Sequence, residues 1–181
     1  IYTLSLHDAL PICLFLLALE SVGASEFGSS NNYAESDLKK AVDKWLEDMG
    51  KRGLDNAKLI PREIDLTTLD GSGCYGKLSV KAAPLTLDEA REYADIIPNA
   101  ERWCWLATGW SGPSKSDGDL ALCVYSNGDW NLSYCSNSCG IRPALKAPSI
   151  LFEDSEAGLD LSKIPTDDLL QEIHRRLAEK A

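Results

Sequence analysis

Few residues of this chain have the types and spacing that enzyme catalysis requires. A serine or cysteine nucleophile needs a histidine base held beside it, and the chain has two histidines, His7 and His174. His174 lies in a polar C-terminal segment beyond a linker, so it is poorly placed to activate a nucleophile. The sequence also lacks a G-x-S-x-G motif, a phosphate-binding glycine loop and a dinucleotide fingerprint. We therefore predict that the chain is not an enzyme and binds no cofactor.

Three aspartates offer the alternative, which is carboxylate chemistry. Asp117 and Asp119 flank Gly118, and Asp129 follows in a nearby turn. Alternating carboxylates can bind calcium, but the further carboxylates and the closing glutamate of an EF-hand loop are missing. We therefore predict a solvated loop. A hydrolase or transferase would need two acids that converge in a pocket with separated pKa values, and that enzyme is the alternative hypothesis.

The six cysteines give no pattern typical of a metal site. Cys135 and Cys139 are four positions apart, whereas structural zinc sites use tighter cysteine pairs and usually histidine. We predict no bound metal. Unpaired thiols are the default expectation, and a disulfide between Cys135 and Cys139 is the alternative if the protein is exported.

A cluster of aromatic residues is the most informative feature of the chain. It consists of Trp103, Trp105, Trp110, Tyr125, Trp130 and Tyr134. Some of these rings must form the core of a small sheet, and we predict structural roles for Trp103 and Trp105. Trp110, Trp130 and Tyr134 instead neighbour segments rich in Gly, Ser, Asn and Asp. Binding loops combine rigid aromatic rings with adaptable small polar groups in this way.

Two polar segments, Ser111–Asp119 and Ser126–Cys139, are therefore predicted to form a ligand surface. Its predicted ligand-binding residues are Trp110, Ser111, Asp117, Asp119, Ser126, Asn127, Asp129, Trp130, Asn131, Tyr134 and Asn137. Arg142 is predicted to be a structural clamp beside this surface. We expect its guanidinium to be partly buried and to donate to backbone carbonyls or to an acid of Ser111–Asp119.

Local patterns predict the elements that position these residues. Ser36 caps a helix from Asp37 to about Met49, and the capping box that starts at Thr86 begins a second helix, which Pro98 ends. Strands are predicted at Cys13–Leu19, Lys77–Ala82, Trp103–Ala107, Leu120–Tyr125, Asp129–Tyr134 and Gly140–Leu145. Asn127-Gly128 predicts a hairpin turn, and Pro143 places its strand at an edge or marks a strand end. Ser25–Asn32 and Asp70–Gly76 are predicted loops.

Several motifs resemble those of one domain family. They are WCWLAT at 103–108, CVYSNGD at 123–129, GIRPAL at 140–145 and, upstream, NNYAESDL at 31–38. They resemble an uncharacterised domain family of gut bacteria and their phages, whose hallmarks are W-W-L-R-S, V-x-x-D-G and G-V-R-P-A-L. The segment 14–20 resembles a strand of that family, which favours a strand there over a secretion signal. The chain departs from the family at Cys104 and at Ala107-Thr108, where the family often has Arg-Ser.

That family is similar in pattern to C-type-lectin-like domains, including the variable proteins of diversity-generating retroelements. Those proteins place a Trp-rich strand, a polar hairpin and a G-F-R-like strand around a variable display surface. The resemblance implies a C-type-lectin-like fold and a display role for 126–140. Ordinary turn composition is the alternative explanation of that segment.

Composition narrows the classes of partner. The formal net charge of −10 argues against nucleic acid, because that affinity comes mainly from Lys and Arg that neutralise phosphates. No apolar run reaches the roughly 18 residues that span a bilayer. We therefore expect a protein or glycan ligand, with no nucleic acid and no membrane span.

The segment Ile1–Ile12 has a separate explanation. It can be encoded by a DNA string that resembles the adapter ligated to fragments for short-read sequencing. We expect it to be an artefact of a metagenomic fragment that is truncated at its N-terminus, and we exclude it from the fold.

These observations predict one α+β domain at 13–147, with two helices packed on a small, mostly antiparallel sheet of C-type-lectin-like topology. A linker follows at 148–165, and a C-terminal tail helix at Thr166–Ala181 carries a leucine stripe suited to homo-oligomer formation. The predicted function is non-enzymatic ligand recognition or display on a bacterial or phage surface, which favours an extracellular or virion location. The third hypothesis is a structural module that assembles through the tail helix.

Overall fold

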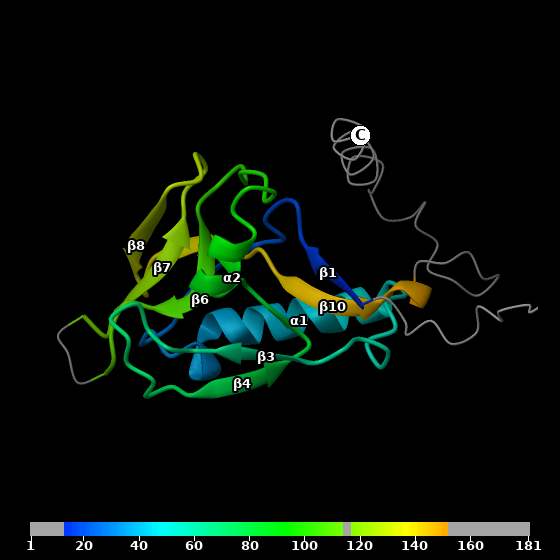
Figure 1. Ribbon diagram of the computed structural model, residues 1–181, viewed down its shortest axis with the longest axis horizontal. Coiled ribbons are helices and arrows are strands. Elements are labelled where there is room, and N and C mark those ends of the chain that lie inside the picture. Colours follow the sequence, from blue (N-terminus) through cyan, green and yellow to red (C-terminus); the bar gives the residue numbers. More distant parts are fainter. Residues whose placement is uncertain (1–12, 114–116, 152–181) are drawn as a thin grey trace, which may run out of the picture.

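The computed structural model describes residues 13–113 and 117–151, and it has an α+β fold (Figure 1). Two α-helices accompany three small sheets, in which all strand pairs but one are antiparallel. The predicted α+β class is confirmed. The segment 1–12 that was predicted to be an adapter artefact, most of the predicted linker at 148–165 and the predicted tail helix at 166–181 lie outside the described residues.

The largest sheet has five strands in the order β2-β9-β6-β7-β8. These strands are β2 (Ala24–Glu26), β6 (Cys104–Gly109), β7 (Leu120–Val124), β8 (Trp130–Tyr134) and β9 (Ser138–Gly140). β6 and β9 are parallel, and the other neighbours are antiparallel. The sheet therefore brings the Trp-rich strand, the hairpin and the start of the GIRPAL motif together, although they are separate in sequence.

Two smaller sheets complete the described domain. Their strands are β1 (Cys13–Leu17), β10 (Ala144–Pro148) and β5 (Ala82–Ala83) in one, and β3 (Arg62–Asp65) and β4 (Lys77–Val80) in the other. β1 pairs with β10 antiparallel along its whole length, from Cys13 opposite Pro148 to Leu17 opposite Ala144. The first and last strands of the described domain therefore lie side by side (Figure 1).

The long helix α1 (Asp37–Lys51) begins as its sequence predicts. The Ser36 hydroxyl accepts a hydrogen bond from the backbone N–H of Lys39 at 2.9 Å, which satisfies one of the unpaired donors of the first turn. A short 3₁₀ helix, η2 (Tyr33–Glu35), precedes it. Leu38 and Val42 are fully buried in the main core with Phe27, Tyr33 and Trp105, among others.

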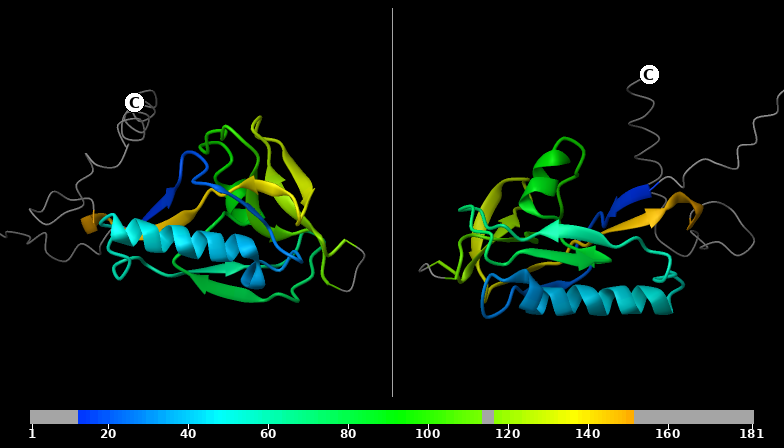
Figure 2. Two further views of the ribbon diagram at one scale, coloured as in Figure 1. Left: turned by 180° about the vertical axis from the view of Figure 1, so that it is seen from behind. Right: turned by 60° about the horizontal axis from the view of Figure 1, so that its bottom comes forward.

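The short helix α2 (Leu87–Glu92) lies on the face of the five-stranded sheet opposite to α1 (Figure 2). Its capping box is complete, because the Thr86 side chain accepts from the Glu89 backbone and the Glu89 side chain accepts from the Thr86 N–H. The second core lies beneath α2, and it includes Leu85, Leu106 and Leu122. Figure 2 shows the strands between α1 on one side and α2 on the other.

Strand β6 is buried on both faces because it separates these two cores. Trp105 and Ala107 belong to the core beside α1, whereas Leu106 belongs to the core beneath α2. These three residues therefore alternate between the two faces of the strand, as side chains of a β-strand do. The continuous burial of β6 is typical of a central strand covered on both faces.

The structure corrects several predicted boundaries. The expected loop at 25–32 begins within strand β2, and β3 lies in a segment for which no strand was predicted. The expected strand at 140–145 is divided, because β9 ends at Gly140 and β10 starts at Ala144 in a different sheet. Pro143 lies in the connection between them. Proline has no backbone N–H, and at this position the sheet does not need one. The short segment η3 (Ser149–Leu151) lies where the linker was expected.

Within the described ranges, no helix is long and apolar enough to cross a membrane.

Candidate functional site

The hairpin between β7 and β8 is the centre of the candidate site. Its turn is closed by hydrogen bonds from Gly128 N to Tyr125 O at 2.9 Å and from Tyr125 N to Asp129 O at 2.8 Å. Gly128 has φ +89°, a conformation that glycine adopts without a Cβ penalty. The Asn127 and Asp129 side chains bond to each other at 2.6 Å, and Asn127 also accepts from the Asp129 N–H. These two predicted ligand residues therefore build the turn itself.

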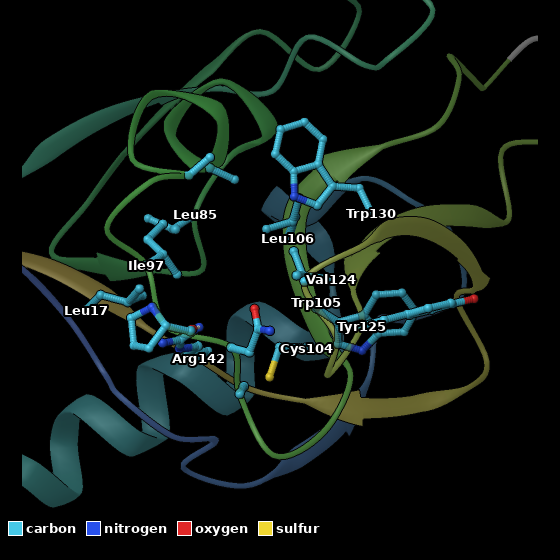
Figure 3. A pocket seen from close by; sticks show the side chains of 16 residues that line it. Leu17, Leu85, Ile97, Cys104, Trp105, Leu106, Val124, Tyr125, Trp130 and Arg142 are labelled. Atoms are coloured by element: carbon cyan, nitrogen blue, oxygen red, sulfur yellow. Dashed lines mark hydrogen bonds between the residues drawn. The ribbon is translucent and has the colours of Figure 1, made fainter.

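An apolar pocket of about 180 Å³ lies between this hairpin, β6 and the segment that follows α2. Leu17, Leu85 and Ile97 line one side, and Leu106, Val124 and Trp130 line the other (Figure 3). The wall is apolar because β6 and β7 direct alternate side chains to this face, as the second core shows. The pocket is thus a continuation of the second core that side chains leave unfilled.

Arg142 lies at one end of this pocket beside Cys104 (Figure 3). Its side chain is 7% exposed. Nε donates to the carbonyl of Ala18 at 2.7 Å, and Nη1 donates to the carbonyl of Pro98 at 2.9 Å. The guanidinium therefore joins the segment after β1 to the segment after α2. These backbone acceptors are of the kind expected for a clamp, but they lie outside the 111–119 loop.

At this end of the pocket, Arg142 is the only charged side chain among the described lining residues. Burial lowers the pKa of Arg142, and Cys104 and Glu20 raise it to a smaller extent. Burial raises the pKa of the Cys104 thiol to about 11, so this neighbour is a neutral thiol at neutral pH. The Glu20 carboxylate instead accepts a hydrogen bond from the Glu101 backbone N–H at 3.0 Å, and neither acid lines the pocket.

Trp130 and Asn99 form the mouth of the pocket. Trp130 is 40% exposed, and Arg91 of α2 lies over its ring with Cζ 5.6 Å from the centroid. Asn99 packs against the hairpin turn, since a Cβ on Gly128 would lie 2.7 Å from its Oδ1. The segment after α2 and the hairpin therefore approach each other across the entrance.

A second concavity, which we name the aromatic cleft, lies beside the same hairpin. Its volume is about 310 Å³, and its lining consists of Glu101, Arg102, Trp103, Ser126, Ser138, Cys139 and Gly140. Trp103 is 47% exposed and stacks on Tyr125, with ring centroids 4.0 Å apart and an interplanar angle of 19°. The cleft thus combines an exposed indole with hydroxyls, one carboxylate and one guanidinium.

The structure separates the two tryptophans that were predicted to be structural. Trp105 is 1% exposed, and its Nε1 donates to the carbonyl of Ser25 at 2.9 Å, as a buried core indole should. Trp103 was expected to have a structural role within the predicted strand. It instead precedes β6, and its side chain is exposed. Its stacking partner Tyr125, one residue beyond β7, holds it at the surface instead.

Most predicted ligand residues lie away from both concavities. Of that predicted set, Trp130 lines the pocket and Ser126 lines the aromatic cleft. Tyr134 is 58% exposed at the far end of β8. The other two predicted residues of β8 and the segment after it, Asn131 and Asn137, are exposed, and Asn137 donates to the Ser133 hydroxyl at 3.0 Å. The single ligand surface predicted from composition is therefore divided in space.

A buried amide, that of Asn31, contacts the backbone at Ser111 and at Leu120. Asn31 donates from Nδ2 to the carbonyls of Ser111 and Leu120, at 2.9 and 3.0 Å, and accepts at 2.6 Å from the Tyr75 hydroxyl. Ser111 is 1% exposed, so its side chain is not part of the exposed surface on which a ligand role was predicted. Trp110 is half-buried.

The three aspartates of the alternative enzyme hypothesis do not gather in a pocket. Asp119 and Asp129 are exposed and Asp117 is half-buried, and none of them lines either concavity. Within residues 13–113 and 117–151, no group of three or more His, Cys, Asp or Glu side chains could hold a metal ion. The six cysteines are free thiols, with Cys13 and Cys74 exposed and the other four buried.

Comparison with known proteins gives no match to a family model, to a curated protein or to a solved structure. The site must therefore be interpreted from its own geometry.

Proposed function

We propose that this chain is a non-enzymatic recognition module of a bacterial or phage surface, with a C-type-lectin-like fold, and that its ligand is a glycan. The single observation that carries the proposal is the exposed, stacked indole of Trp103 within a cleft of polar groups. Rigid aromatic rings offer large contact area at low entropic cost, and polar neighbours provide orientation.

The chemistry of the aromatic cleft suits a polyhydroxylated ring. Ser126, Ser138, Glu101 and Arg102 supply hydroxyl, carboxylate and guanidinium groups that can donate to or accept from sugar hydroxyls. The stacking of Trp103 on Tyr125 fixes the indole before any ligand arrives, which lowers the ordering cost of binding.

Two topological features support the C-type-lectin-like part of the proposal. The first and last strands of the described domain pair antiparallel, and two helices cover opposite sides of the intervening sheet. A recognition surface built by loops at one end of such a framework is consistent with the resemblance drawn from the sequence motifs.

A glycan array probed with the intact chain tests the function. We expect binding to one class of glycan, and Trp103→Ala should weaken it at least ten-fold because the stacking surface is lost. Tyr134→Ala is the matched control, since it removes another exposed ring that lies outside the cleft, and it should retain affinity.

Absence of glycan binding above background would refute the glycan proposal. If binding occurs but Trp103→Ala and Tyr134→Ala weaken it equally, the cleft is not the site. A protein array run in parallel shows whether a chain that binds no glycan binds a protein instead.

A further inference from the structure

The two buried arginines of the described chain differ in how their charge is compensated. Arg62 is 3% exposed, and its guanidinium pairs with the Glu89 carboxylate and donates to the carbonyls of Ala83 and Pro84. Arg142 has its two backbone carbonyls, but no salt bridge joins it to any carboxylate in 13–113 or 117–151. A buried charge is costly unless it is paired and hydrogen-bonded.

One nitrogen of Arg142 is left without a partner. Nη2 is buried and makes no hydrogen bond to the described residues. Arg142 lines the apolar pocket, and among the described residues of its wall it is the one with a charged side chain. A buried guanidinium with one unsatisfied donor therefore lines a cavity that has no acid among its described lining residues.

We propose that the apolar pocket binds a small molecule with an apolar body and one carboxylate, and that Arg142 Nη2 receives the carboxylate. Charge-assisted hydrogen bonds between guanidinium and carboxylate are stronger than neutral ones. The carboxylate would complete the hydrogen bonding of the guanidinium and pair directly with its charge, which Glu20 offsets only without an ion-pair contact. This site is separate from the aromatic cleft and lies across the hairpin from it.

The size of the pocket limits the body of that ligand. A cavity of about 150 Å³ lined by aliphatic side chains holds one benzene molecule, and this pocket measures about 180 Å³. Leu85, Leu106 and Val124 present the aliphatic wall, and Trp130 at the mouth offers an aromatic edge. One ring or a short alkyl chain with a carboxylate fits these dimensions.

The test is calorimetric titration of the intact chain at pH 7 with phenylacetate and with its neutral isostere, 2-phenylacetamide. We expect saturable binding of phenylacetate, with an affinity at least ten-fold above that of the amide. Arg142→Gln should reduce phenylacetate affinity to that of the amide, whereas Arg52→Gln removes the same charge from an exposed site and should change neither affinity.

A second variant keeps the proposal testable if Arg142→Gln does not fold. Ala94 lines the pocket but its own side chain is exposed, so Ala94→Phe should obstruct the cavity without disturbing the core. It should weaken phenylacetate at least ten-fold. Ala57→Phe, at an exposed position outside the pocket, should leave binding intact.

Three results would overturn the inference. They are equal affinity of the wild type for acid and amide, full retention of binding in Ala94→Phe, and no saturable binding of phenylacetate, benzoate or hexanoate. None of these results affects the glycan-array result, because the aromatic cleft and the pocket have no lining residue in common.

Discussion

At the residue scale, two buried polar side chains organise the surface around the hairpin. Arg142 joins the segments after β1 and α2, and Asn31 binds the backbone carbonyls of Ser111 and Leu120. Both act through backbone carbonyls, which are available at any position regardless of side-chain type. Their neighbours in sequence therefore gave little indication of what they contact.

Asn31→Ala should lower the free energy of unfolding by about 3 kcal/mol. The substitution leaves the buried Ser111 carbonyl without this donor and the Tyr75 hydroxyl without its acceptor, and the Leu120 carbonyl keeps only the Trp110 N–H. Each unsatisfied buried group costs about 1–3 kcal/mol. Urea denaturation followed by circular dichroism measures the change. Asn137→Ala, which removes an exposed amide, should cost under about 0.5 kcal/mol. Equal losses in the two variants would contradict the role given to Asn31.

At the element scale, the hairpin β7–β8 positions both concavities. Trp130 on its return strand borders the pocket, and Tyr125 just after β7 supports Trp103 in the cleft. The turn between them is held by Asn127, Asp129 and the left-handed Gly128. The small polar residues here are explained by turn geometry, which is the alternative that the sequence left open.

Gly128→Ala should destabilise the chain by about 1–2 kcal/mol and weaken ligand binding at the pocket. An alanine at φ +89° is strained, and its Cβ would lie 2.7 Å from Asn99 Oδ1 at the pocket mouth. Thermal unfolding and the phenylacetate titration measure the two effects. Gly73→Ala is the control, because its φ is not positive and nothing lies within 4 Å of its Cβ. Unchanged stability of Gly128→Ala would mean that the turn relaxes without cost.

At the scale of the whole molecule, one central sheet separates two cores. The larger core lies between the sheet and α1, and the smaller one lies beneath α2. Cys123, Cys135 and Cys139 belong to the larger core, where they pack as small apolar residues. The pocket extends from the smaller core, so the pocket and the main packing lie on opposite faces of the sheet.

The free energy of unfolding should fall as pH rises from about 9 to 12. Burial raises the pKa of Cys104 to about 11 and those of Cys123 and Cys135 to about 12. The unfolded chain therefore releases these protons at lower pH than the folded chain, and stability present below the unfolded pKa is lost as pH rises through the folded values. Each thiol contributes a slope of up to about 1.4 kcal/mol per pH unit. Denaturation midpoints measured at pH 8, 9 and 10 check this expectation.

Cys123→Ala is the matched variant for the pH experiment. It should make the alkaline loss shallower, whereas Cys74→Ala, at an exposed thiol, should leave the slope unchanged. Thiol titration of the native protein should detect Cys13 and Cys74 first. Rapid reaction of all six thiols in the native state would contradict the burial of the other four.

The sequence by itself determined those elements that depend only on residues close together in the chain. The caps at Ser36 and Thr86, the Asn127-Gly128 turn and the alternation of β6 follow from backbone hydrogen-bond satisfaction and side-chain period. These signals act between neighbours in sequence, so the composition of a short segment is enough to read them.

Tertiary structure decided the features that depend on distant partners. Strand β2 forms because β9 lies beside it, and the polar Arg62 faces inward in β3 because Glu89 of α2 supplies its counter-charge. The exposure of Trp103 and the unpartnered nitrogen of Arg142 likewise arise where separate segments meet. A pocket is the space that several elements leave unfilled, and the packing that defines it involves residues far apart in sequence.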